Sequence, residues 1–148
     1  PFRTLSSLKY GLNFSLSNNR IIKLLTLIFG IIIFMLGMIF YSRIYTFITF
    51  SLLGLFLVGL YIYNEKFITT FYLTYFAITF SFFILINGTL TGGTLDPPPV
   101  WYNNNETLNV RFWTIPIEDF FYSMLLLLSN IWLFEIFKSN EVKSNSIK

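Results

Sequence analysis

Cysteine and histidine are both absent from this chain of 148 residues. Without them the chain cannot form disulfide bonds, zinc sites made of Cys and His, a Ser-His-Asp triad or a histidine proton shuttle. The sequence also lacks the G-x-G-x-x-G fingerprint of a Rossmann site for a flavin or a nicotinamide. We therefore expect no metal site and no tightly bound redox cofactor, and nothing in the composition indicates nucleic-acid binding.

Charged residues are scarce, making up 11% of the chain, while 55% of the residues are hydrophobic. A soluble domain carries roughly 25% charged residues, so this chain has too few to cover a globular surface. Three stretches contain no acid or base at all, namely 24–42, 44–64 and 67–95. Each exceeds the ~18 residues that mark a membrane-spanning candidate, since about 20 helical residues cross ~30 Å of hydrocarbon.

The pattern predicts an all-α integral membrane protein, an antiparallel bundle of about four transmembrane helices. Very short turns separate the first three spans, so consecutive helices should be antiparallel neighbours. The expected spans are 21–41, 44–63, 67–87 and 115–137. A lead-in over 1–20, or the end of a preceding helix, comes before the transmembrane domain at 21–138. That domain includes a loop at 88–114, and a polar tail follows at 139–148.

The distribution of Lys and Arg predicts the orientation of the bundle. With four spans, eight basic residues fall on the side that holds both termini, and Arg43 and Arg111 fall on the other side. Basic residues are enriched on the cytoplasmic side of membrane proteins. We therefore expect a multi-pass protein of the cell membrane with both termini in the cytoplasm. The eight residues are Arg3, Lys9, Arg20, Lys23, Lys66, Lys138, Lys143 and Lys148.

Two adjacent acids, Glu118 and Asp119, open the last predicted span, in the sequence TIPIEDFFYSMLLLLSN. One interpretation is structural. With Ile115 as the cap and Pro116 in the first turn, Glu118 would be the third helical residue and would complement the helix dipole and its unpaired N–H groups. The other is functional, because ionisable groups at membrane depth are costly and usually serve a function. Desolvation and mutual repulsion favour a proton on one carboxyl, as a general acid requires.

Other polar and aromatic residues should gather at the same rim of the bundle. Tyr122 lies one helical turn beyond the two acids, and Trp101 and Trp113 suit the headgroup boundary, where such rings accumulate. This rim is either a site or an ordinary extracytoplasmic loop region. Its further members are Arg43, Tyr45, Asn87, Asp96, Glu106 and Arg111.

Two segments, INGTLTGG and VWYNNNETLNVRFWTIPIEDFFYSMLLLLSNIWLFE, resemble the second half of the membrane-embedded, flavin-independent lycopene cyclases. That family is built from two similar multi-helix halves, fused or separate, each with a Pro-x-Glu-Glu/Asp motif. Pro116-Ile117-Glu118-Asp119 matches the motif, and the surrounding match covers about 87–135. The earlier spans agree only in hydropathy.

The resemblance implies a lycopene β-cyclase that closes the acyclic ends of lycopene into β-ionone rings without net redox change. It implies Glu118 as the acid and Asp119 as its partner or base, with the two roles open to exchange. The expected partners are the lipid bilayer, lycopene or a related carotenoid, and a homologous first half. Candidate substrate-binding residues are Tyr122, Trp101, Trp113, Asn87 and Arg111.

Two other functions stay open. The chain carries the motif once, so the resemblance implies that it is one half of such an enzyme. A non-catalytic membrane scaffold subunit would have the same hydropathy. A cyclase of longer, fifty-carbon carotenoids would share the motif as well.

Overall fold

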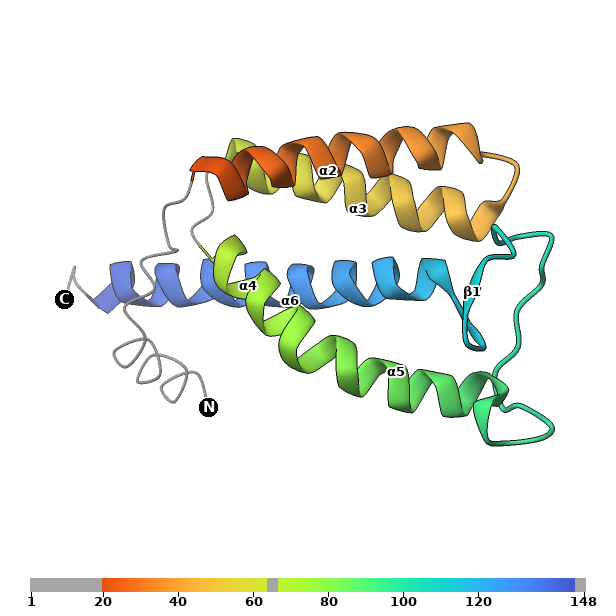
Figure 1. Cartoon of the computed structure of the whole chain (residues 1–148). Coiled ribbons are helices and arrows are strands. Elements are labelled where there is room, and N and C mark those ends of the chain that lie inside the picture. The colour runs from red at the N-terminus through yellow and green to blue at the C-terminus, as the bar shows by residue number, and fades with distance from the viewer. Residues whose placement is uncertain (1–19, 64–66, 146–148) are drawn as a thin grey trace.

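A computed structural model describes residues 20–63 and 67–145, and its ribbon is mostly helical (Figure 1). Three described helices are long and apolar enough to cross a membrane: α2 (Arg20–Ile39), α3 (Ile44–Ile62) and the part of α6 over Ile117–Lys138. A bent pair, Thr70–Ala77 with Phe80–Gly93, makes a fourth span if it is counted as one. These helices confirm the predicted all-α membrane fold. The predicted lead-in, apart from Arg20, and the predicted turn at 64–66 lie outside the described residues.

Glycines bring α2 and α3 close together. A Cβ added to Gly54 of α3 would lie 2.7 Å from the carbonyl oxygen of Gly30 and 2.7 Å from Phe34. A Cβ on Gly37 of α2 would lie 2.8 Å from the Ser51 hydroxyl. Any larger residue would push the two backbones apart, as at close helix crossings in membranes. The short turn before Ile44 then makes α2 and α3 an antiparallel pair, as predicted (Figure 1).

The third span differs from its prediction, because it is neither straight nor finished at Asn87. It consists of α4 (Ile68–Thr74), a π-helical turn η1 (Tyr75–Thr79), α5 (Phe80–Gly88) and a second π-helical turn η2 (Thr89–Gly93). The two halves are bent by 41°. π-helical turns are a recognised cause of such kinks. Helical backbone therefore continues past Asn87 as far as Thr91, and Gly92 then breaks it with a positive φ of 105°. The first part of the predicted loop at 88–114 is helical.

The last helix also begins later than predicted. Ile115 and Pro116 form a short strand, β2 (Ile115–Pro116), which pairs antiparallel with β1 (Arg111–Phe112). Pro116 is therefore not in the first helical turn, because it sits opposite Arg111 in this pair. The helix α6 (Ile117–Asn145) follows at once and continues through most of the predicted polar tail. The sequence EVKSN contains neither Gly nor Pro to end the helix earlier.

The buried core lies between α3 and its neighbours, with Leu53, Leu57 and Leu128 fully buried. Large apolar side chains elsewhere are half or more exposed, such as Ile32, Leu55 and Phe82. Apolar residues facing outward in this way are expected where lipid takes the place of water.

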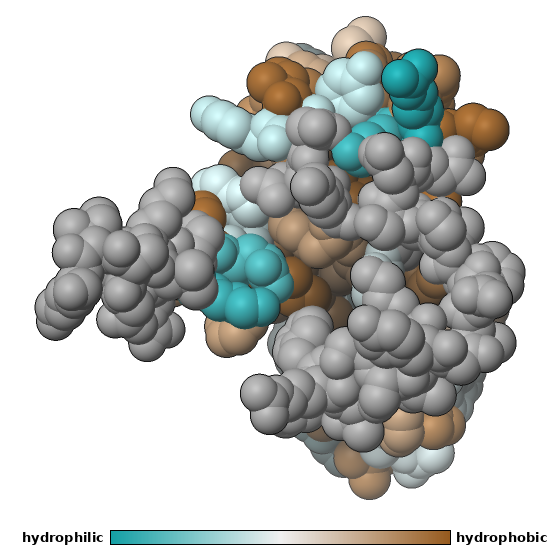
Figure 2. All heavy atoms as spheres, turned by 90° about the vertical axis from the view of Figure 1, so that its left-hand side faces the viewer, coloured by the Kyte–Doolittle hydropathy of each residue, from teal (hydrophilic) through white to brown (hydrophobic). Residues whose placement is uncertain are grey.

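Figure 2 looks at the end of the bundle where α2 begins and shows hydrophilic residues beside apolar ones.

The opposite end of the bundle gathers the α2–α3 turn, the loop after η2 and the start of α6 (Figure 1). The carbonyl oxygen of Glu106 accepts hydrogen bonds from the backbone N–H groups of Tyr45 and Thr46, at 3.1 and 3.4 Å. Glu106 thereby satisfies N–H groups that the first turn of α3 leaves unpaired. The loop is fastened to α3 at this end.

Labelling of introduced cysteines tests the predicted orientation of this bundle. The natural chain has no cysteine, so each variant carries a single thiol. We expect Asn104→Cys, in the exposed part of the loop, to react with an impermeant maleimide from outside intact cells. Ser144→Cys should react only after permeabilisation. The reverse pattern would contradict the basic-residue argument. Labelling of both from outside would show that α6 does not cross the membrane and would contradict the four-span model.

Candidate active site

The two adjacent carboxyls, Glu118 and Asp119, are both buried at the start of α6. Glu118 is 0% exposed and Asp119 is 4% exposed. The β1–β2 pair directly before the helix positions them, since the Ile117 N–H donates to the carbonyl oxygen of Val110 at 3.0 Å. The chain therefore enters α6 directly from the β1–β2 hairpin, with both acids facing the interior. Buried carboxyls of this kind need specific partners.

Glu118 is held through one of its two oxygens. Oε1 accepts hydrogen bonds from the Thr46 hydroxyl and from the Leu108 backbone N–H, each at 2.6 Å. Oε2 is buried and has no hydrogen-bond partner among the described residues. Both donors come from outside α6, so these contacts differ from those of a carboxylate that caps its own helix. The geometry leaves one oxygen of Glu118 free for a proton.

Asp119 has the opposite environment, because three donors surround its carboxyl. The Tyr45 hydroxyl donates to Oδ1 at 2.6 Å, and the Asn87 amide and the Tyr102 hydroxyl each donate to Oδ2 at 2.7 Å. These donors come from α3, α5 and the loop. Three donors suit an ionised carboxylate, which only accepts hydrogen bonds. The adjacent acids are therefore chemically unequal, although their sequence context is shared.

Three tyrosine rings lie around Asp119. The ring centroid of Tyr45 is 5.8 Å from that of Tyr102 and 6.4 Å from that of Tyr122. Burial, together with the hydrogen bond to Asp119 and the charge of that carboxylate, raises the pKa of Tyr102 well above its ordinary value. Tyr102 therefore stays a neutral donor over the physiological pH range. Aromatic faces beside an acid can stabilise a cation formed next to them.

The loop over the site is braced by two arginines that both contact Asn104. Arg43 donates to the backbone oxygens of Asn104 and Thr107, the former at 2.8 Å. Arg111 donates to the Asn104 side-chain oxygen and to the Thr114 carbonyl, each at 2.9 Å. The loop therefore has a fixed path from α3 to the β1–β2 pair, and this path sets the position of the Leu108 N–H.

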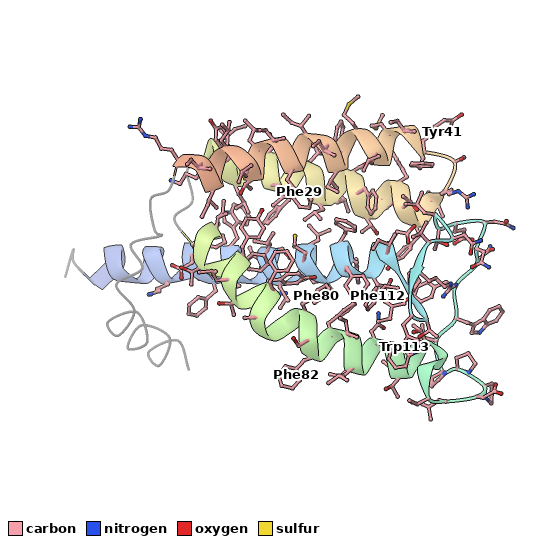
Figure 3. All side chains as sticks on the ribbon, in the orientation of Figure 1. Phe29, Tyr41, Phe80, Phe82, Phe112 and Trp113 are labelled. Atoms are coloured by element: carbon pink, nitrogen blue, oxygen red, sulfur yellow. The ribbon has the colours of Figure 1, made fainter. Side chains whose placement is uncertain are left out.

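The structure brings only part of the predicted site together. Asn87 lies at Asp119 as one of its donors, and Tyr122, 44% exposed, lies beside Tyr45. Trp101 is 83% exposed. Trp113 packs its indole so tightly on α5 and η2 that a Cβ on Gly93 would lie 2.3 Å from it (Figure 3). The two tryptophans therefore take no part in the hydrogen bonds to the carboxyls. Arg111 bonds Asn104 and Thr114 and so holds the loop.

Sequence reasoning missed Thr46 and the Leu108 N–H, the two donors to Glu118. It placed Tyr45 on the same rim without a role. Nothing in the sequence marks Thr46, since threonines also occur elsewhere in these spans. A backbone N–H carries no signature in any sequence. A helical register would have placed Tyr45 and Thr46 in the first turn of the second span, but would not have said which acid each contacts.

A family model described as lycopene cyclase matches residues 42–137. The chain belongs to the lycopene cyclase family. The match confirms the resemblance found in the sequence and extends it back to the second span. Comparisons with curated proteins and with solved structures found no match.

Membership of the lycopene cyclase family gives the buried carboxyls a chemical setting, since it implies cyclisation of a carotenoid. Every donor to Glu118 and Asp119 falls inside the matched range: Tyr45, Thr46, Asn87, Tyr102 and Leu108. The lycopene cyclase region thus contains the whole hydrogen-bond network described above. It also contains α3, the bent third span and α6 as far as Phe137.

Proposed function

We propose that this chain is one half of a lycopene β-cyclase, with Glu118 as the general acid and Asp119 as the base. The observation that supports this most is the inequality of the two carboxyls. Glu118 has a buried oxygen without a partner, and Asp119 is surrounded by three donors. Pairs of acids whose environments favour opposite protonation states are how one site performs acid and base chemistry at neutral pH.

In the first step, the proton on Oε2 of Glu118 goes to a carbon of the terminal double bond of the carotenoid. A C–H bond forms, the π bond breaks, and the positive charge is left on the neighbouring tertiary carbon. Oε1 keeps its two donors throughout, so the carboxylate that remains is stabilised by Thr46 and Leu108. Stabilising the charge that develops is usually a large part of catalysis.

In the second step, a double bond further along the same chain attacks the cation, and a C–C bond closes the six-membered ring. The positive charge moves onto the ring, where the faces of Tyr45 and Tyr122 can stabilise it. The burial of the carboxyls keeps water away from a cation that water would trap.

In the last step, Asp119 takes a proton from the ring carbon next to the cation, and the electron pair of that C–H bond becomes the ring double bond. The ring gains one proton and loses one, so the reaction is an isomerisation with no oxidation or reduction. Proton transfer from Asp119 back to the adjacent Glu118 restores the starting state. The donors to Asp119 are neutral hydroxyls and an amide. Because none of them carries a positive charge, Asp119 can take up a proton and release it again.

We also propose that activity requires a homologous first half, as a separate subunit or as a domain of the same polypeptide. The sequence carries the Pro-x-Glu-Glu/Asp motif once, at Pro116–Asp119 with Pro-Ile-Glu-Asp. A scaffold role for this chain would leave the buried, half-paired Glu118 unexplained. Lycopene itself is the proposed substrate, with fifty-carbon carotenoids as the alternative.

Pigment analysis tests this function directly. Lycopene-accumulating cells that express this chain with its other half should convert lycopene into a product with β-ionone rings. Cells with either half alone should keep the linear pigment. Chromatography and the visible spectrum of the extract distinguish the products. A pair that is present in the membrane but leaves both lycopene and longer acyclic carotenoids unchanged would contradict the proposal.

A further inference from the structure

The face of α3 that carries Tyr45 continues along the whole helix as one stripe. Residues 7, 11, 14 and 18 positions after Tyr45 fall on the same side of an α-helix, because each interval is close to a whole number of turns. These residues are Leu52, Phe56, Gly59 and Tyr63. The stripe therefore leads from the donor to Asp119 toward the other end of the bundle.

Two aromatic pairs join this stripe to α6. Tyr45 and Tyr122 lie at one end, and Phe56 and Trp132 lie further along, with ring centroids 5.7 Å apart and planes at 88°. The second pair is 11 residues further along α3 and 10 residues further along α6. The two helices therefore run in the same direction side by side, and a continuous seam extends from the carboxyls to Trp132.

An apolar groove of about 320 Å³ opens at the far part of the seam. It is lined by Leu52, Leu55, Phe56, Gly59 and Leu60 of α3, by Tyr63 directly after α3, and by Trp132 of α6. A Cβ on Gly59 would meet nothing within 4 Å, unlike one on Gly54, so packing between helices does not account for this glycine. Fourteen residues of helix separate Tyr45 from Gly59, a distance of about 21 Å at 1.5 Å per residue.

We propose that the α3–α6 seam holds the polyene chain of the carotenoid, with its reacting end at Tyr45 and Tyr122 and its far part in the groove beside Gly59 and Trp132. This inference rests on the proposed function and names where the substrate lies. The occupant must be thin, straight and apolar, because the groove is apolar and lies along the same α3–α6 seam as Tyr45 and Tyr122, further along the direction of the helices. A carotenoid, whose long axis fits the ~30 Å of hydrocarbon, has this shape.

Filling the groove tests the proposal through the enzyme's kinetics. In liposomes that contain both halves, Gly59→Leu should raise the apparent KM for lycopene by about tenfold or more while kcat changes little. A hydrophobic pocket discriminates against misfitting groups by roughly 10–200-fold. The matched control is Ala77→Leu, at an exposed position of η1 outside the groove. Equal KM values for the two variants would overturn the proposal.

Photo-cross-linking gives a second readout that needs no turnover. A photoreactive residue in place of Leu55, which lines the groove and is 57% exposed, should form a coloured adduct with lycopene. The same residue in place of Leu25 should form only lipid adducts; Leu25 is also 57% exposed and lines a separate apolar groove with Phe29 and Tyr72. Coloured adducts at both positions, or at neither, would overturn the proposal. If wild type never cyclises lycopene but the adduct forms at Leu55, the proposed function fails and the groove assignment stands.

Discussion

Cells that express Glu118→Gln with the other half of the enzyme are expected to accumulate lycopene in place of cyclised product. Gln keeps an oxygen that can accept from Thr46 and Leu108, so the protein should reach the membrane at its normal level. An amide cannot supply the acidic proton, and general acid catalysis contributes roughly 10²–10⁴-fold. We therefore expect the rate of ring formation to fall by about that factor, measured by chromatography of pigments at matched protein levels.

Glu106→Gln is the matched control, because it makes the same substitution at an exposed loop carboxyl that bonds Asn103. It should cyclise at a near-normal rate. If Glu118 served only to stabilise the start of α6, the Gln variant would lose ~1 kcal/mol or less of stability and keep its activity. Near-normal ring formation by Glu118→Gln would therefore show that the acid has been misassigned.

Asp119→Asn is expected to lower β-ring formation by about 10²–10⁴-fold as well, because it removes the proposed general base. The Asn amide nitrogen is also a donor, and it would replace an oxygen that accepts hydrogen bonds in Asp119. Its N–H groups would face other donors, either Tyr45 or the pair of Asn87 and Tyr102. The acid is still present in this variant, so a cation can form without its intended base. The residual products should therefore include ring isomers or hydrated forms that Glu118→Gln does not make.

Chromatographic separation of the ring isomers, with mass spectrometry for added water, distinguishes the two variants. Asp96→Asn, at an exposed loop position, should resemble wild type. If Asp119→Asn makes only the normal product at a normal rate, Asp119 is not the base. If both acid variants cyclise normally, the catalytic interpretation of the Pro-Ile-Glu-Asp motif is wrong.

The spans and the acid pair could be predicted because each leaves a mark in the sequence. Long stretches without charge require a non-aqueous setting whatever their neighbours are, and two carboxyls between apolar residues are conspicuous. The bend in the third span left no such mark. Residues 67–95 contain no Pro to predict a kink, and π-helical turns have no composition of their own.

The partners of the acids could not be predicted because they depend on distances across the fold. Thr46 is 72 positions from Glu118, and the Leu108 N–H reaches Oε1 only because the loop is bonded to α3 at Glu106. Asn87 was expected at the site as a substrate-binding residue, and its bond to Asp119 was not expected. The residue types at the rim were visible in the sequence, but their pairing depends on the relative rotation of α3, α5 and α6.

Tyr45 and Thr46 are neighbours in the chain, and so are the two carboxyls that they contact, Asp119 and Glu118. A slip of α3 along α6 by one position would therefore break both contacts at the same moment. An enzyme with α3 and α6 out of register would have neither the acid nor the base in position. It would therefore not form a cation that it could not deprotonate. The arrangement that aligns the two helices thus makes a misaligned enzyme inactive, so that it does not release wrong products.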